Sequence, residues 1–297
     1  HPPGAVGAPA TALACGDMLG LHADQLAAAV GIASSRTGGV LANVGSMTKA
    51  LHCGDAAANG VQAALLAAQC FTADADALGS PRGWGASLFG PTFDQQHLLA
   101  PIGKGRALCP GPAWKLFPSQ FATHFGITAA LAAYEAMGHK TANDIRRVTL
   151  RTPAMPYIDR PYPQSGLDGK FSWQYTAAIA LLDGKVEPAS FEDERRFSAE
   201  VVALLNRIVL INDPAISGRF DQMHVDIEVE LDDGEMIRQR CDAPLGSWGR
   251  PVPAERVMEK VRALIVGVVG PKRAIAIERA IVTADNFSIR SLMAMLA

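Results

Sequence analysis

A lysine and a histidine stand three residues apart in the segment GSMTKALHCG, as Lys49 and His52. A lysine side chain is a fixed cation and a histidine titrates near neutral pH, so this pair could bind a carboxylate and move a proton. A bare pair at this spacing is more often a solvated turn before a helix. On spacing alone the solvated turn is the better interpretation, and an anion site needs support from elsewhere in the chain.

Further candidate groups lie in turns and in segments rich in proline. Lys115 precedes a Phe-Pro turn, and Arg36 lies in the turn SRTGG. Tyr157 and Arg160 share the loop YIDRPYP, where a phenol can donate a proton and a guanidinium can bind a carboxylate with two hydrogen bonds. Loop packing explains this pair equally well, and a lone lysine is most often a surface residue. Taken together, the cationic groups in loops favour a small anionic substrate.

Helices are expected to position these groups. Residues 55–69 carry apolar side chains at helical spacing, with Asp55 as an N-cap or a first-turn acid. The N-terminus of that helix would add partial positive charge beside Lys49 and His52. Residues 1–8 are a segment rich in proline and glycine that leads to the first helix. Further helices are predicted over residues 11–20, 23–34, 119–137 (with His124 as a packing residue), 171–184 and 198–206, and after residue 253.

Strand signals appear in the second half of the chain. Residues 145–152 and 207–213 read as strands, and residues 224–241 alternate on both sides of Asp232-Asp233-Gly234, which predicts a β-hairpin. The strands and helices do not alternate strictly, and this favours an α+β domain. Residues 79–113 are rich in glycine and proline, so we expect a linker with loops and a domain boundary near Pro112.

The composition excludes several classes of function. The chain has 297 residues and a formal net charge of -2, which does not indicate a nucleic-acid partner or a membrane surface. Apolar runs stay below the roughly 18 residues of a membrane span. Motifs for dinucleotides, P-loops and zinc proteases are absent, so no cofactor and no metal are predicted. The cysteines are scattered and resemble reduced cytoplasmic thiols: Cys15, Cys53, Cys70, Cys109 and Cys241.

Several segments, taken in order, resemble the MmgE/PrpD family. They are HPPGAVGAPATALACGDMLGLHADQLAAAVGIASS, GSMTKALHCGDAAANGVQAALLAAQCFT, WKLFPSQFATHFG, IDRPYP and FSWQYTAAIALLDGKV. The resemblance spans nearly the whole chain. Activities in the family include dehydration of 2-methylcitrate, decarboxylation of cis-aconitate and epimerisation of iminodisuccinate. Family chains extend further at the N-terminus, so we expect this chain to be N-terminally incomplete.

The resemblance implies a mainly α fold with an α+β lid. Residues 1–112 and 246–297 would form a large all-helical domain, and residues 113–245 the inserted lid. It also implies a cytoplasmic homodimer, joined through the helical domain, with a cleft between the domains. The expected activity is that of a lyase without cofactor or metal, which acts on a small di- or tricarboxylate by proton transfer next to a carboxylate.

The resemblance also implies roles for individual residues. His1, Lys49 and Tyr157 are the expected catalytic residues, with His1 and Tyr157 as proton donors or acceptors. Lys49 and Lys115 would hold substrate carboxylates and stabilise the negative charge that develops on deprotonation. The remaining substrate-binding candidates are Gln120, His52, Arg36 and Arg160, and His52 is expected mainly to shape the turn and the start of the helix.

One position departs from the family pattern. Gln120 follows Pro118 by two residues, where decarboxylase-like members tend to have His and methylcitrate dehydratases Glu. A glutamine side chain does not exchange a proton at neutral pH. An epimerase or isomerase of a dicarboxylate therefore stays open, as does a non-catalytic fragment or subunit that needs the missing N-terminal helices.

Overall fold

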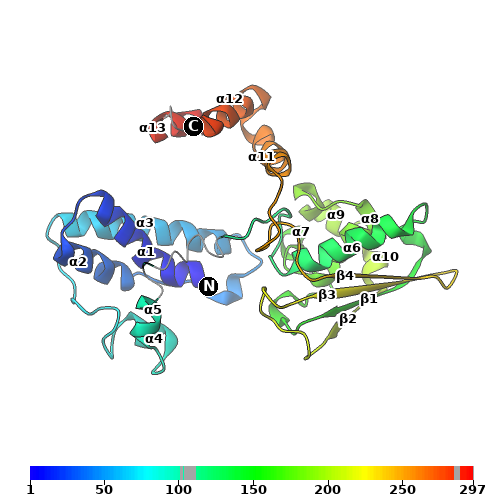
Figure 1. Cartoon of the computed structure of the whole chain (residues 1–297), viewed down its shortest axis with the longest axis horizontal. Coiled ribbons are helices and arrows are strands. Elements are labelled where there is room, and N and C mark those ends of the chain that lie inside the picture. The colour runs from blue at the N-terminus through cyan, green and yellow to red at the C-terminus, as the bar shows by residue number, and fades with distance from the viewer. Residues whose placement is uncertain (101–102, 104–111, 284–287, 297) are drawn as a thin grey trace. The chain divides into compact units, whose positions relative to one another are not determined.

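The computed structural model describes residues 1–100, 103, 112–283 and 288–296, so that Cys109 lies outside it. The chain forms two compact units, His1–Gly111 and Pro112–Ala297 (Figure 1). Both units are rich in helix, and the second also contains a small mixed sheet. The predicted fold class, mainly α with a smaller α+β part, is confirmed at this level. The assignment of residues 246–297 to the helical domain stays a prediction.

Three helices with small side chains form the core of the first unit. They are α1 (Pro2–Met18), α2 (Ala23–Ser34) and α3 (Thr48–Ala68). Their contact surfaces are almost entirely alanine and glycine, which lets the backbones approach closely. A Cβ atom at Gly60 would lie 2.7 Å from the Ala8 carbonyl oxygen and 2.4 Å from Thr11 Cβ. The buried members of this core are Ala8, Ala12, Ala29, Ala33, Ala56, Ala63 and Ala67.

The starts of α1 and α3 differ from the predicted ones. α1 begins at Pro2 instead of near residue 11, because prolines fit the first turn of a helix, where no N–H donor is needed. α3 begins at Thr48 instead of near Asp55. Asp55 is therefore not the N-cap, and both Lys49 and His52 lie on the helix itself and not in a turn before it. The prediction for residues 23–34 is confirmed to the residue.

The glycine-rich segment after α3 holds two short helices, α4 (Trp84–Phe89) and α5 (Gln95–Leu99), where only loops were predicted. The indole N–H of Trp84 donates to the Ala5 carbonyl oxygen at 3.1 Å and ties this segment to α1. The Asp94 carboxylate caps α5 by accepting from the Gln96 N–H at 2.8 Å.

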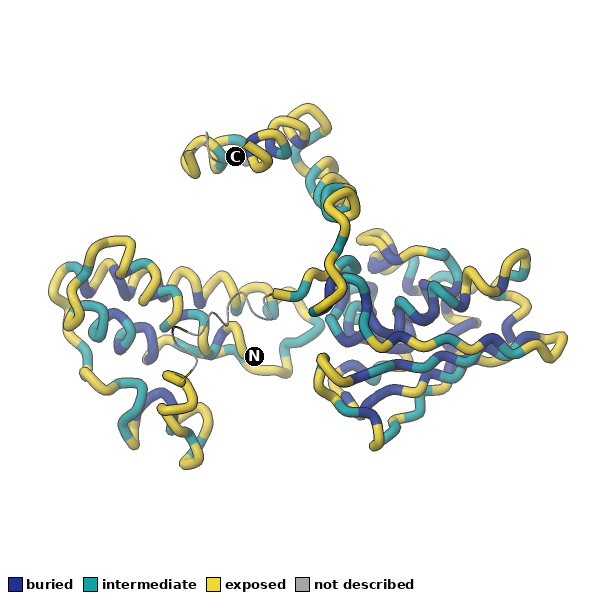
Figure 2. The backbone as a smooth tube through the Cα atoms, viewed as in Figure 1, coloured by how far each residue is buried: buried dark blue, intermediate teal, exposed yellow. Residues whose placement is uncertain are grey.

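The sheet of the second unit has the strand order β2-β1-β3-β4. β1 (Ile145–Thr152) pairs in parallel with β2 (Ile208–Asn212) and antiparallel with β3 (Val225–Leu231), which forms the predicted hairpin with β4 (Met236–Cys241). Residues of β3 alternate between buried and half-buried positions. One face therefore packs inward, where α6 (Thr123–Met137) and α8 (Trp173–Asp183) cover it (Figures 1 and 2).

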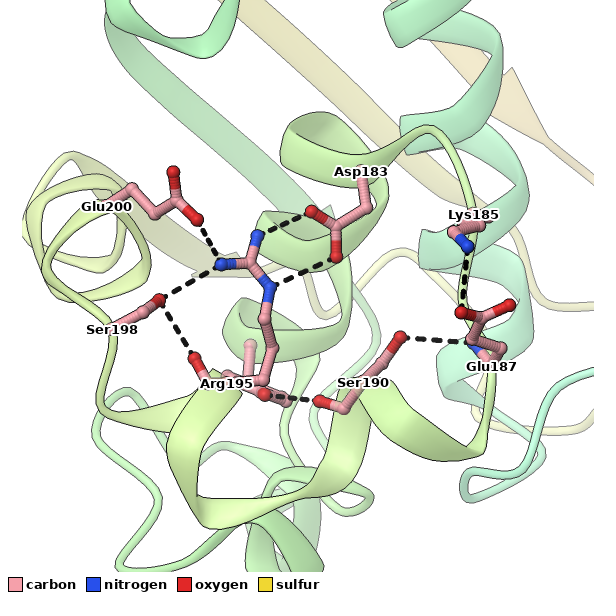
Figure 3. A network of polar contacts seen from close by, with 8 residues as sticks. Asp183, Lys185, Glu187, Ser190, Arg195, Ser198 and Glu200 are labelled. Carbon is pink, nitrogen blue, oxygen red and sulfur yellow. Dashed lines mark hydrogen bonds and ion pairs between the residues drawn. The ribbon is translucent and has the colours of Figure 1, made fainter.

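An arginine holds the short helices beside the sheet in place. Arg195, on α9 (Asp193–Arg196), donates to both carboxylate oxygens of Asp183 at the end of α8, at 2.5 and 3.2 Å (Figure 3). It also pairs with Glu200 on α10 (Ala199–Leu205). The remaining short elements are α7 (Gly166–Gly169) and the 3-10 helices Leu41–Asn43, Ala142–Asp144, Pro156–Ile158 and Pro188–Phe191.

The C-terminal part is helical, as predicted, with α11 (Ala254–Val269), α12 (Pro271–Val282) and α13 (Ile289–Leu296). Large apolar side chains on these helices are exposed, including Val268, Val282 and Ile289. Within the described ranges, no helix is both long and apolar enough to cross a membrane.

The close contact of α1 with α3 gives a first prediction. Gly60→Ala should lower the free energy of unfolding by about 1–3 kcal/mol, because the added methyl group meets backbone atoms of α1. Gly54→Ala on the same helix is the matched control, since a Cβ there meets nothing within 4 Å. That control should be neutral or stabilise by up to about 1 kcal/mol. Urea unfolding followed by circular dichroism measures both; equal effects of the two substitutions would contradict this packing.

A second prediction concerns His124 on α6. Its ring is fully buried, with centroids 5.2 Å from Phe117 and 5.5 Å from Phe121. Burial, and then the charge of Lys115, lower the pKa of His124 to about 3. Below pH 6.5 His124 is protonated in the unfolded chain, whereas in the folded chain it stays neutral until the pH nears 3. The free energy of unfolding should therefore fall by up to about 1.4 kcal/mol per pH unit as the pH drops through this window. Above pH 6.5 His124 should cause no loss of stability.

Urea midpoints at pH 7.5 and pH 5.0 test this prediction. The loss of stability from pH 7.5 to pH 5.0 should be smaller in His124→Leu than in the wild type, whatever the absolute stability of the variant. His139→Gln, at an exposed position just after α6, should keep the wild-type loss. An unchanged loss in His124→Leu would show that His124 does not carry this pH dependence.

Candidate active site

Two candidate histidines of the first unit lie against each other. His1 directly precedes α1 and His52 lies on α3; their Nδ1 atoms are 3.2 Å apart and their ring centroids 5.2 Å apart. A hydrogen bond between these two nitrogens needs a hydrogen on one of them only, so the pair can share one proton. The backbone of Gly39 approaches the His52 ring so closely that a Cβ there would lie 3.0 Å from it. His52 was predicted mainly to shape a turn; the structure places it in direct contact with His1.

His52 also lines a small polar cavity of about 140 Å³ in the first unit, together with Arg36, Asp55 and Asn59. The Asn59 side chain donates to the Arg36 carbonyl oxygen at 3.1 Å and so ties the SRTGG turn to α3. The sequence interpretation missed Asp55 and Asn59 as neighbours of His52. Their spacing of three and seven residues from His52 is the signal that could have found them, because it places all three on one side of α3.

Lys49 lies in the first turn of α3, one turn before His52, and is half-buried. The spacing of three residues puts both side chains on the same side of the helix. The first turn of a helix carries partial positive charge. A lysine at this point adds to that charge, and an anion that bound here would be attracted by both.

Three candidates of the second unit form one connected group. The carboxamide nitrogen of Gln120 donates to the Tyr157 hydroxyl at 3.0 Å, and the Arg160 Nε donates to the Tyr157 carbonyl oxygen at 3.0 Å. Tyr157 as a whole is 46% exposed, so a ligand can reach this residue. Burial of the rest of the ring raises the pKa of Tyr157, which keeps its proton in place at neutral pH. Tyr157 is thus a potential proton donor, already held by a hydrogen bond.

Arg160 has several partners in the residues that follow it along the chain. Its guanidinium pairs with Asp168 and lies 5.6 Å from the centre of the Phe171 ring. These contacts fix the loop that carries Tyr157. The sequence interpretation named Arg160 as a carboxylate ligand and did not foresee Asp168, which lies eight residues further along the chain.

Lys115 lies close to the start of the second unit and is exposed. Its carbonyl oxygen accepts a hydrogen bond from the Lys260 side chain on α11. Its own charge is felt by His124, whose pKa it helps to lower. Among the residues that the structure describes, no group of three or more His, Cys, Asp or Glu side chains could hold a metal ion.

Comparison with known proteins matches both parts of the chain. Residues 1–96 match the MmgE/PrpD N-terminal domain and residues 117–285 match the MmgE/PrpD C-terminal domain. The first match contains His1, Lys49 and His52, the second Gln120 and Tyr157, and Lys115 lies between them.

Individual relatives come from animals, fungi and bacteria. The chain is 32% identical to cis-aconitate decarboxylase of Mus musculus, over 89% of this chain and 55% of the relative. It is 27% identical to cis-aconitate decarboxylase of Aspergillus terreus, over 95% of this chain and 61% of that protein. It is 32% identical to 2-methylcitrate dehydratase of Salmonella typhimurium, over 69% of this chain and 44% of that protein.

The chain spans about half the length of these curated relatives. The matches nevertheless cover most of its residues, in both units and in the order that the family has. The chain therefore belongs to the MmgE/PrpD family.

Proposed function

We propose that this chain carries lyase chemistry on a small di- or tricarboxylate, such as a cis-aconitate- or 2-methylcitrate-like acid, without a cofactor or a metal. The observation that carries the proposal is the 32% identity to cis-aconitate decarboxylase along 89% of the chain. Similarity to a 2-methylcitrate dehydratase supports the same class, because loss of CO2 and loss of water both need a proton to move next to a carboxylate. A cytoplasmic homodimer, joined through the helical domain, belongs to the same proposal.

The roles of the side chains follow from their chemistry. In the first unit, Lys49 binds a substrate carboxylate at the positive end of α3 and stabilises the charge that develops when the neighbouring carbon loses a proton. His1 accepts or donates the proton, and its contact with His52 keeps the ring in one orientation. In the second unit, Lys115 binds carboxylate, and the hydroxyl of Tyr157, an exposed residue, donates or accepts a proton.

A second candidate function is an epimerase or isomerase of a dicarboxylate. The observation that favours it is Gln120, whose amide cannot exchange a proton at neutral pH, next to Tyr157, whose hydroxyl can donate one. An enzyme that removes a proton and returns it to the other face needs neither loss of water nor loss of CO2.

Substitution of Lys49 tests the assigned carboxylate contact. Lys49→Ala should lower kcat/KM by roughly 100-fold or more, because a charge that stabilises the transition state is lost. Lys272→Ala, at an exposed position on α12, is the control and should keep wild-type kinetics. Near wild-type kcat/KM in Lys49→Ala would remove Lys49 from the mechanism.

The type of reaction can be read from the products. Proton NMR of cis-aconitate, 2-methylcitrate and simple dicarboxylates, each incubated with the full chain in D2O, should show loss of CO2 or water from one of them. Exchange of a carbon-bound proton for deuterium without such loss would favour the isomerase instead. No reaction with any of these acids would contradict the proposed substrate class.

A further inference from the structure

The carboxamide of Gln120 is fixed in one orientation by the backbone. Its Oε1 accepts a hydrogen bond from the Ala122 N–H at 2.5 Å. A backbone N–H can only donate, so the amide oxygen must lie on this side and the NH2 group on the other. The main-chain N–H of Gln120 donates to the Lys170 carbonyl oxygen at 2.9 Å, which holds the residue at the same place. Gln120 therefore offers a donor, and not an acceptor, to the group beyond its Nε2.

That group is the hydroxyl of Tyr157, 3.0 Å from Nε2. The phenol oxygen accepts this bond, and its own hydrogen must point elsewhere. The structure directs the hydrogen to Met155 Sδ, 3.8 Å away. A thioether is a weak acceptor, and an oxygen of a carboxylate ligand would replace it readily. The hydroxyl thus has one firm partner, on the side of Gln120, and one that a ligand can displace.

We propose that Gln120 is a positioning residue, whose fixed amide donates to the Tyr157 hydroxyl and directs the phenol hydrogen away from itself and toward bound substrate. The inference rests on the proposed function, because the direction of this hydrogen matters only if Tyr157 transfers a proton. The role differs from that of a substrate ligand, since the hydrogen bond in question goes to the Tyr157 hydroxyl and not to substrate. It also differs from an acid or base, since the amide keeps all its hydrogens.

The step itself is a simple proton transfer. The O–H bond of Tyr157 breaks, the hydrogen passes to the substrate carbon or to the departing hydroxyl group, and both electrons remain on the phenolate oxygen. The Nε2–H of Gln120 keeps its hydrogen bond to that oxygen. A hydrogen bond to an ionised oxygen is stronger than one to a neutral oxygen, so the amide stabilises the phenolate more than the phenol. Gln120 therefore assists the departure of the proton and offsets part of the effect of burial on Tyr157.

Two substitutions separate the donor of Gln120 from its structural contact. Gln120→Glu keeps an oxygen for the Ala122 N–H and replaces the donor by an oxygen, so the phenol would now donate to the new carboxylate. Gln120→Met removes both the donor and the oxygen that accepts from the Ala122 N–H, without adding charge, so the comparison with Gln120→Glu isolates the effect of that oxygen. Gln164→Glu is the matched control: it adds the same charge in the neighbouring loop, at an exposed side chain that donates to the Tyr162 carbonyl oxygen and not to a phenol.

The direct measurement is an NMR titration of the full chain labelled with 13Cζ-tyrosine. The protein has four tyrosines, and Tyr157→Phe assigns the signal of interest. The Tyr157 pKa should rise in Gln120→Met, because the phenolate loses its donor, and rise further in Gln120→Glu, because a negative charge faces the phenolate. Tyr162, whose hydroxyl donates to Asn206, is the internal reference and should titrate as in the wild type. Gln164→Glu should leave the Tyr157 titration unchanged.

The pH profile of activity is the second measurement, with whichever substrate the wild type converts. In Gln120→Met, kcat/KM should fall about tenfold, less than the roughly 100-fold loss expected when a proton donor is removed in Tyr157→Phe. The alkaline limb of the profile should move to higher pH together with the Tyr157 pKa. A residue that only supported the fold would lower activity without moving this limb.

The two inferences can fail separately. If the Tyr157 titration is the same in the wild type, Gln120→Met and Gln120→Glu, then Gln120 does not position the phenol, whatever the kinetics of Tyr157→Phe. If the titration shifts as described but Tyr157→Phe retains wild-type activity, the hydrogen bond stands, but Gln120 positions no reacting proton and the part of the proposed function assigned to Tyr157 is wrong.

Discussion

The first unit depends on how closely α1 can approach α3. Glycine and alanine on both helices remove the side chains that would keep the backbones apart, and Gly60 lies directly against the Ala8 carbonyl oxygen. His1 directly precedes α1 and His52 lies on α3, so the separation of the two helices also sets the separation of the two imidazole rings. A wider helix pair would leave two independent histidines. The small residues therefore serve both stability and the contact of His1 with His52.

Local signals in the sequence predicted much of the fold. The bounds of α2 and β1 agree with the predictions because each has a clear period and a clear stop. The hairpin was predictable for the same reason, with Gly234 at a φ of +88° in its turn. The starts of α1 and α3 were not predicted correctly, since proline and glycine usually indicate irregular structure. Prolines in the first turn of α1, and glycines that let α1 and α3 pack closely, are the exceptions to that rule.

The candidate residues could be chosen from the sequence, but their contacts could not. Gln120 and Tyr157 are 37 residues apart, and no local sequence pattern indicates that the Gln120 amide donates a hydrogen bond to the Tyr157 hydroxyl. The contact of His1 with His52 depends likewise on the packing of two helices and not on either segment alone. The ion pair of Arg160 with Asp168 is more local, yet nothing in the segment YIDRPYP itself indicates it.

The second unit contains two pairs of tyrosine and amide with opposite hydrogen-bond directions. The Tyr162 hydroxyl donates to Asn206 Oδ1, whereas the Tyr157 hydroxyl accepts from Gln120 Nε2. The same two functional groups can bond either way, so the direction at Tyr157 must come from a third partner, the Ala122 N–H that holds the Gln120 oxygen. That N–H belongs to the turn just before α6, and the fold of this turn decides where the phenol proton points. A glutamine at this position thus supplies no proton of its own, but it can determine which atom receives the proton of Tyr157.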